Sequence, residues 1–193
     1  MSYRLLTPAL EALAKSCDHS PLFKLTACLP MHIPTFIAFE VTDVETGYPY
    51  AIAWSLPDGQ YKSVLVRPEE DWLIDFEMGQ YSPDAPPLQD LLDKGESVKD
   101  ILKEWQHDFE RGELYCQDPI LAQYCLDLMF NVLDKECEYE VISEYDCYDK
   151  IDSFDVDDQR RWIMDTEGLN ATQCEDMVRA MIYVYSRMED AEL

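Results

Sequence analysis

Hydrophobic positions change their period along the chain, and the change separates a strand-rich part from a helix-rich part. Three short runs that are rich in β-branched and aromatic residues, 36–41 (FIAFEV), 50–56 (YAIAWSL) and 60–66 (QYKSVLV), predict β-strands. The sequence PDG between the last two is a strong turn signal and predicts a hairpin. Three consecutive strands joined by short turns indicate an antiparallel meander.

Helical spacing of apolar residues begins after the proline-rich stretch YSPDAPPL. Ser97 starts a capping-box pattern for a helix that runs to Arg111, and Asp118 before Pro119 predicts the N-cap of the next helix. Shorter segments, ELYC and EYEVISEY, are strand candidates, DDQRRWIMD predicts a short helix, and a capping box at Thr172 opens the last helix. The order of these elements predicts an α/β fold with a mixed sheet flanked by helices.

The chain is expected to form one main domain. Its 193 residues suffice for a single core, and residues 35–193 hold all the strands and most of the helices. Residues 1–34 are expected to be an N-terminal extension with a short helix after Thr7-Pro8. The chain has no stretch of roughly 18 apolar residues and no signal-peptide pattern, so we expect no membrane association.

The charge of the chain indicates which kinds of partner it could bind, and its cysteine content indicates the compartment in which it occurs. Forty acidic residues against fifteen basic ones give a net charge of −25, which repels phosphate backbones and favours either simple solubility or a basic protein partner. The seven cysteines include no pair at the C-x-x-C spacing, so neither a disulfide framework nor a structural zinc site is expected. Scattered free thiols are typical of a cytoplasmic protein.

Several motifs occur in the same order as in a known nuclease family. FIAFEV, YPYAIAW, PDG and VLVRP are followed by Trp72, then by GELYCQDPILAQYCLDLMF and by CEDMVRAMIYVYSRM. In this order they resemble the DEDD 3′–5′ exonucleases, in particular compact bacterial exonuclease-like proteins, over about residues 35–188. The resemblance implies an RNase H-like mixed central sheet, with an antiparallel three-stranded meander plus parallel strands, flanked by helices.

The same resemblance implies a site for two divalent cations, Mg²⁺ or Mn²⁺, held about 4 Å apart by four carboxylates, with a nearby histidine or tyrosine as general base. Aligned on YPYAIAW, the first Asp-x-Glu pair falls on Ala38 and Glu40, the central aspartate falls near Ala122, and the last falls on Asp176. Residue 170 or 171 takes the place of the histidine. Only Glu40 and Asp176 then remain as catalytic or metal-binding candidates, and no cofactor is expected to bind well.

A second alignment remains open. It uses Asp43 and Glu45 as the first pair and Asp118 as a substitute in the central helix. Competing interpretations are that Asp43 and Glu45 are solvated loop acids and that Asp118 is a helix N-cap.

Three functions are therefore considered. The first is a catalytically inactive or strongly impaired exonuclease-like protein that acts as an acidic binding or structural protein. The second is an active metal-dependent 3′–5′ exonuclease on single-stranded RNA or DNA, the only one of the three with a nucleic-acid substrate. The third is an acidic nucleic-acid mimic that inhibits a basic partner.

Overall fold

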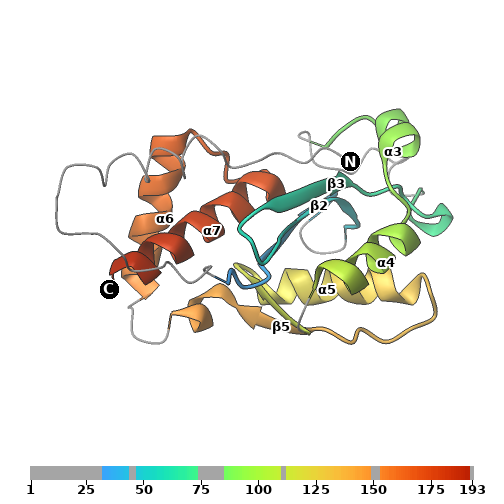
Figure 1. The fold of residues 1–193 in the computed structure, drawn as a ribbon. Helices are drawn as coiled ribbons and strands as arrows, with labels where there is room; N and C mark the ends of the chain where they lie inside the picture. Colours follow the sequence, from blue (N-terminus) through green and yellow to red (C-terminus); the bar gives the residue numbers. More distant parts are fainter. Residues whose placement is uncertain (1–31, 44–46, 74–84, 110–111, 149–152, 192–193) are drawn as a thin grey trace.

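A computed structural model describes residues 32–43, 47–73, 85–109, 112–148 and 153–191 (Figure 1). The expected N-terminal helix and Glu45 lie outside these residues. The strands are β1 (Ile37–Val41), β2 (Pro49–Ser55), β3 (Tyr61–Leu65), β4 (Glu113–Cys116) and β5 (Glu140–Ser143). The helices are α3 (Leu88–Lys94), α4 (Val98–Asp108), α5 (Pro119–Asn131), α6 (Ser153–Glu167) and α7 (Cys174–Ala191), with short 3₁₀ turns η1 (Glu70–Trp72) and η2 (Glu144–Cys147).

The predicted meander is confirmed. β1 and β3 each pair antiparallel with β2, so β2 is the central strand and all seven of its residues are buried. In the tight turn between β2 and β3, Gly59 has a φ of +81°, a conformation that glycine adopts without steric cost. Gly47, before β2, is also required, because a Cβ there would lie 2.1 Å from the backbone nitrogen of Asp43.

The parallel strands extend this sheet on the β1 side. β4 and β5 pair parallel to each other, with α5 as the connection between them. Phe36 forms a parallel bridge with Tyr115, and the Tyr115 N–H donates to the Thr35 carbonyl at 2.9 Å. The structure thus has a three-stranded antiparallel sheet, β1-β2-β3, and a two-stranded parallel sheet, β4-β5, which this bridge places beside β1.

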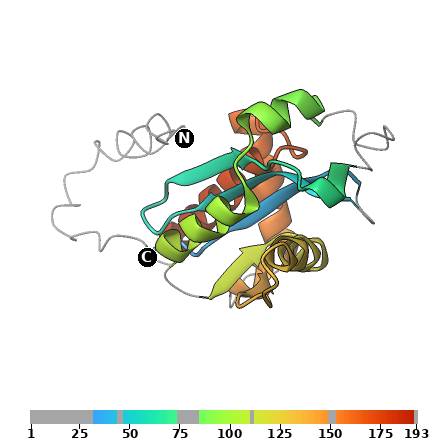
Figure 2. The same cartoon turned by 90° about the vertical axis from the view of Figure 1, so that its right-hand side faces the viewer.

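Helices cover the two faces of this sheet. The α4 and α5 helices supply one core cluster together with Ile37 and Trp54, whereas α7 packs against β1, β2 and β3 from the other side. The α6 helix packs on α7 and lies farther from the sheet, as Figures 1 and 2 show. None of the described helices is both long enough and apolar enough to cross a membrane.

The last two helices differ from their predicted starts. α6 begins at Ser153, before the predicted segment at 157, and α7 begins at Cys174. The capping box predicted at Thr172 is wrong in its geometry, because the Thr172 hydroxyl donates to Asn170 Oδ1 instead of capping the helix. Another residue, distant in sequence, supplies the cap.

Candidate functional site

Alternation along β1 directs its side chains to two different core clusters. Ile37 and Phe39 pack with the residues of α4 and α5, whereas Ala38 packs on the cluster that includes the buried face of α7. Glu40 lies on the same side of the strand as Ala38 and reaches α7 directly. Residues 38 and 40 therefore lie on one face of β1, as two carboxylates that bind the same cation would have to.

Glu40 is the cap of α7. Its Oε1 accepts a hydrogen bond from the backbone N–H of Cys174 at 2.8 Å, and its Oε2 accepts one from the Tyr50 hydroxyl at 3.0 Å. Cys174 is the first residue of the helix, where backbone N–H groups have no partner within the helix. The negative carboxylate also interacts favourably with the positive end of the helix dipole.

Asp176, the second candidate, lies in the same first turn of α7 and is engaged in the same way. Its Oδ2 accepts from the Asn170 N–H at 2.9 Å, and its Oδ1 accepts from Arg179 Nη1 at 2.7 Å. The fold thus brings Glu40 and Asp176 to one helix end. There, each carboxylate oxygen of the two residues already accepts a hydrogen bond from a protein donor.

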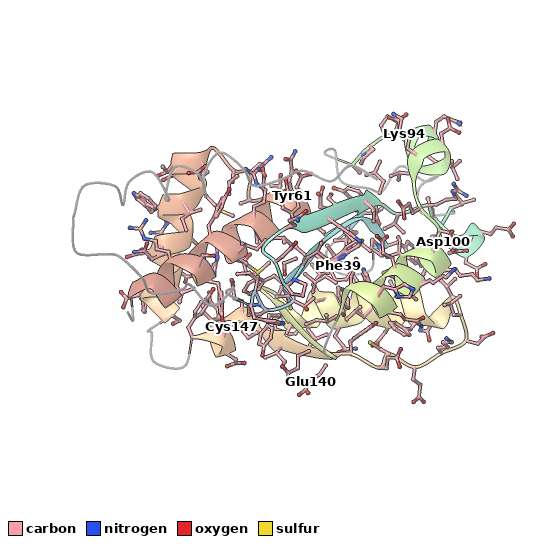
Figure 3. All side chains as sticks on the ribbon, in the orientation of Figure 1. Phe39, Tyr61, Lys94, Asp100, Glu140 and Cys147 are labelled. Atoms are coloured by element: carbon pink, nitrogen blue, oxygen red, sulfur yellow. The ribbon has the colours of Figure 1, made fainter. Side chains whose placement is uncertain are left out.

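A third acid at this helix end is also paired. Glu175 Oε1 accepts a hydrogen bond from the Tyr61 hydroxyl at 3.0 Å. Figure 3 shows Tyr61 on β3 beside the beginning of α7. Tyr50 and Tyr61 therefore link the central and edge strands of the meander to this helix end through carboxylates, which anchors α7 on the sheet.

The rival carboxylates do not join this group in the described structure. Asp118 is the N-cap of α5, as its competing interpretation predicted, because its Oδ1 accepts from the N–H groups of Ile120 and Leu121 at 3.1 and 3.0 Å. Asp43 is exposed just beyond β1, and Glu45 lies outside the described residues.

Ala122 lies in a different environment from Ala38. It is 3% exposed and belongs to the core cluster of Ile37 and Trp54 on the α4 and α5 side of the sheet. A carboxylate at this position would be surrounded by apolar side chains. Positions 38 and 122 are two of the four at which the exonuclease family would have a carboxylate. The fold places them in different core clusters, on opposite sides of the sheet.

Among the described residues, Glu40 and Asp176 alone do not supply the ligands for two divalent cations. Mg²⁺ and Mn²⁺ need several oxygen ligands that are free to coordinate them. Within the described ranges, no group of three or more His, Cys, Asp or Glu side chains is arranged to hold a metal ion. Of the chain's three histidines, His32 and His107 are exposed, and His19 lies outside the described residues.

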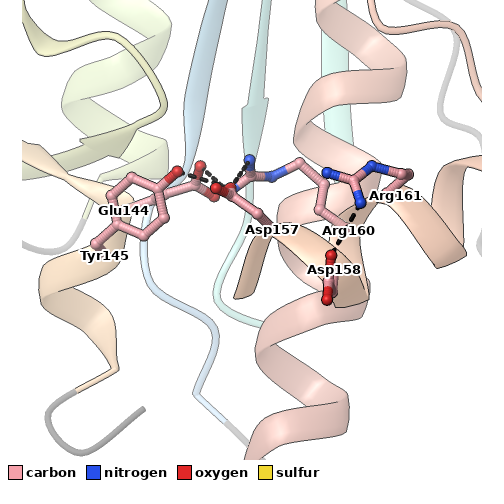
Figure 4. Close-up of polar contacts among 6 residues, drawn as sticks. All are labelled: Glu144, Tyr145, Asp157, Asp158, Arg160 and Arg161. Carbon is pink, nitrogen blue, oxygen red and sulfur yellow. Dashed lines mark hydrogen bonds and ion pairs between the residues drawn. The ribbon is translucent and has the colours of Figure 1, made fainter. Parts of the chain in front are cut away.

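A second polar cluster, which the sequence did not predict, joins η2 to α6 (Figure 4). Glu144 is fully buried and forms an ion pair with Arg160, which also donates to Asp157 Oδ1 at 2.9 Å. The Tyr145 hydroxyl donates to the same Asp157 oxygen at 2.7 Å. These four residues, Glu144, Tyr145, Asp157 and Arg160, connect the end of the parallel strands to α6.

The cluster is incompletely satisfied. Glu144 Oε2, Arg160 Nε and the Tyr148 hydroxyl have no hydrogen-bond partner among the described residues. Burial raises the pKa of Glu144 to about 7, because it penalises the charged carboxylate more than Arg160 stabilises it. Sequence contained one signal of this cluster: Arg160 falls at helical spacing between the buried Val156 and Ile163, where an apolar residue is expected.

The described cysteines are free and unsuited to nucleophilic chemistry. Cys116, Cys125 and Cys174 are buried, and Cys137 and Cys147 are partly buried. Burial raises the pKa of each thiol, and for Cys174 the adjacent Glu40 carboxylate adds to the effect. These thiols stay protonated at neutral pH, whereas nucleophilic attack needs the thiolate.

Comparison with known proteins assigns no family. No family model matches the chain, and a search of the curated proteins finds no match.

Proposed function

We propose that the chain is an exonuclease-like protein of RNase H-like fold in which the metal-binding carboxylates have become structural caps. In this proposal it is catalytically inactive or strongly impaired and acts as an acidic binding or structural protein. The antiparallel meander β1-β2-β3, the parallel pair β4-β5 and the parallel bridge between Phe36 and Tyr115 support the fold assignment.

The proposal rests on the hydrogen bonds that the Glu40 carboxylate accepts. Its two oxygens accept hydrogen bonds from the Cys174 N–H and the Tyr50 hydroxyl. A divalent cation at Glu40 would share these oxygens with two protein donors, which already draw on the negative charge of the carboxylate. With methyl groups at positions 38 and 122, Asp176 is the one other carboxylate at the family positions, and both of its oxygens also accept hydrogen bonds from protein donors.

A nuclease assay tests the proposal directly. The full chain is incubated with labelled single-stranded RNA or DNA and with Mn²⁺ or Mg²⁺, and release of mononucleotides is measured. We expect no turnover above that of the same reaction with EDTA, and no increase in melting temperature with either ion. Turnover that EDTA abolishes, and that Glu40→Gln or Asp43→Asn also abolishes, would overturn the proposal and support an active 3′–5′ exonuclease.

One observation keeps the active exonuclease as a second candidate. Asp43 is exposed directly after β1, at the end of the strand where the family holds its first carboxylates. In that case the activity would depend on Asp43, Glu45 and Asp176, with Asp118 as the substitute in the central helix. Asp43→Asn would then abolish turnover, whereas Glu40→Gln would leave it nearly unchanged.

The net charge of −25 supports the third candidate, a nucleic-acid mimic that occupies a basic partner. Such a complex would weaken steeply with salt, because exposed charges are screened within about 10 Å at 0.1 M ionic strength. Titration with a basic peptide at low and high salt measures this dependence. Binding that does not change with salt would contradict mimicry.

A further inference from the structure

A cavity of about 320 Å³ lies between α4 and the C-terminal end of α5 with the segment that follows it. This volume is at the lower end of the range for small-molecule sites. The apolar part of its lining comes from Leu102 on α4, Phe130 on α5, and Leu133 and Tyr139 after it. Its lining contains neither Glu40 nor any residue of α7, so the cavity is independent of the proposed function.

Three lysines line the same cavity. Lys99 and Lys103 lie on α4, and Lys135 follows α5. They are three of only fifteen basic residues in a chain with forty acidic ones. None of the three forms an ion pair with any residue that the structure describes, whereas the two other described lysines, Lys62 and Lys94, both do.

The two α4 lysines occupy positions that cost helix stability. Lys99 lies in the first turn of α4, where a cation opposes the helix dipole. Lys103 lies four residues later on the same face, and like charges at this spacing repel each other. Lys135 lies four residues after the end of α5, so this argument applies to Lys99 and Lys103 alone.

The cavity side of α4 is a continuous stripe at helical spacing. Lys99, Leu102, Lys103 and Gln106 follow the i, i+3, i+4, i+7 pattern, so the lysines flank an apolar floor. Glu138 also lines the cavity, which leaves a net charge of +2 from three lysines and one glutamate. Positive charge above an apolar floor is complementary to a ligand with an anionic head and an apolar body.

We propose that this cavity binds an amphipathic small molecule whose head carries two negative charges, that is, a phosphate monoester with an aliphatic or aromatic body. The charge of +2 matches such a head, and lysine binds phosphate as a point charge. Leu102, Phe130 and Leu133 contact the body. Lys99 and Lys103 then occupy positions that cost helix stability because they bind the anionic head of the ligand.

Calorimetric titration of the full chain with octyl phosphate tests the proposal. At pH 8 its head carries about two negative charges. Octanoate supplies one charge, octanol supplies none, and inorganic phosphate has no apolar body. We expect octyl phosphate to bind at least about tenfold more tightly than each of these three compounds, and more weakly as salt is added. Equal binding of octyl phosphate and octanol, or of octyl phosphate and inorganic phosphate, would overturn the proposal.

Paired variants locate the site. Lys99→Gln with Lys103→Gln should lower the affinity for octyl phosphate at least about tenfold. Arg67→Gln with Lys94→Gln changes the net charge equally at exposed positions outside the cavity lining, and should leave the affinity unchanged. Equal losses in the two double variants would show a general charge effect and overturn the assignment. Displacement of octyl phosphate by a lower concentration of an acidic peptide or a short oligonucleotide would assign the cavity to a macromolecule instead.

Discussion

The carboxylate of Glu40 accepts a hydrogen bond at 2.8 Å from the backbone N–H of Cys174, although the two residues are 134 positions apart in sequence. The contact joins β1 to the first turn of α7 and satisfies a helix N–H that would otherwise lack a partner. It uses the one acid that the family resemblance identifies on the first strand. A position expected to hold metal therefore serves the packing of the last helix.

Replacing Glu40 distinguishes a cap from a metal ligand through the sign of the stability change. We expect Glu40→Ala to lower the free energy of unfolding by about 1–2 kcal/mol, the usual cost of losing a cap. Glu40→Gln should lower it less, because the amide keeps one acceptor oxygen. Urea denaturation without divalent ions measures both. In a metal site without its cation, removal of one carboxylate would relieve repulsion, so a gain in stability would contradict the cap.

Position 122 should not tolerate the family's aspartate. Ala122 is 3% exposed among apolar side chains, so we expect Ala122→Asp to lower the free energy of unfolding by about 3 kcal/mol or more, through an unpaired buried charge. Chemical denaturation measures the loss. Ile120→Asp is the matched control on the same helix, since Ile120 is 85% exposed and an acid in the first turn is favourable. Its stability should stay within about 0.5 kcal/mol of wild type. Equal effects of the two variants would show that position 122 is accessible.

The buried Glu144 predicts a pH dependence of stability with a definite sign. Burial raises its pKa to about 7 in the folded state from the ordinary value of 4.5. Between these values the folded state binds the proton and the unfolded state does not. The contribution of Glu144 is therefore fully present below about pH 4.5 and is lost as pH rises through about 7.

The Glu144→Gln variant isolates this contribution. Relative to wild type, the variant should gain stability as pH rises from 5 to 8, by at most about 1.4 kcal/mol per pH unit. Denaturation curves at a series of pH values measure the difference. Glu140→Gln removes the same charge from an exposed residue on β5 and should show a flat difference. A difference for Glu144→Gln that changes in the opposite direction would mean that Arg160 holds the carboxylate ionised in the folded protein.

Replacing Lys99 should stabilise the protein. Lys99→Gln removes a cation from the first turn of α4 and a like-charge neighbour of Lys103, so we expect the free energy of unfolding to rise by about 0.5 kcal/mol. Urea denaturation measures the change. Lys94→Gln, which removes an exposed lysine paired with Asp90 on α3, should give no gain. A loss of stability in Lys99→Gln would show that the lysine has a structural role.

Much of the fold follows from local sequence pattern. The three strands of the meander, the turn at Gly59, the Ser97 cap of α4 and the Asp118 cap of α5 all depend on residues that are close together in the chain. Ser97 Oγ accepts from the Asp100 N–H at 3.2 Å, three residues away, as its motif predicts. Such contacts are visible in sequence because the backbone alone brings the partners together.

The start of α7 and the polar cluster at Glu144 could not be predicted in this way. Thr172 has the local pattern of a cap, but the helix begins at Cys174 and Glu40 provides the cap from β1. Glu144 lies at the end of a predicted strand, and its burial against Arg160 depends on how α6 packs after η2. In both cases, the interacting side chains belong to elements that are far apart in sequence.

Sequence by itself determined the order of the strands and of the described helices other than α3, the acidic composition and the methyl groups at positions 38 and 122, because these depend only on residue identity and local spacing. Only the tertiary structure decided that Glu40 caps α7, that Ala122 lies in the other core cluster and that Lys99, Lys103 and Lys135 share one cavity. The physical reason is that hydrogen bonding, burial and charge clustering arise between elements, and their partners are chosen only when those elements pack.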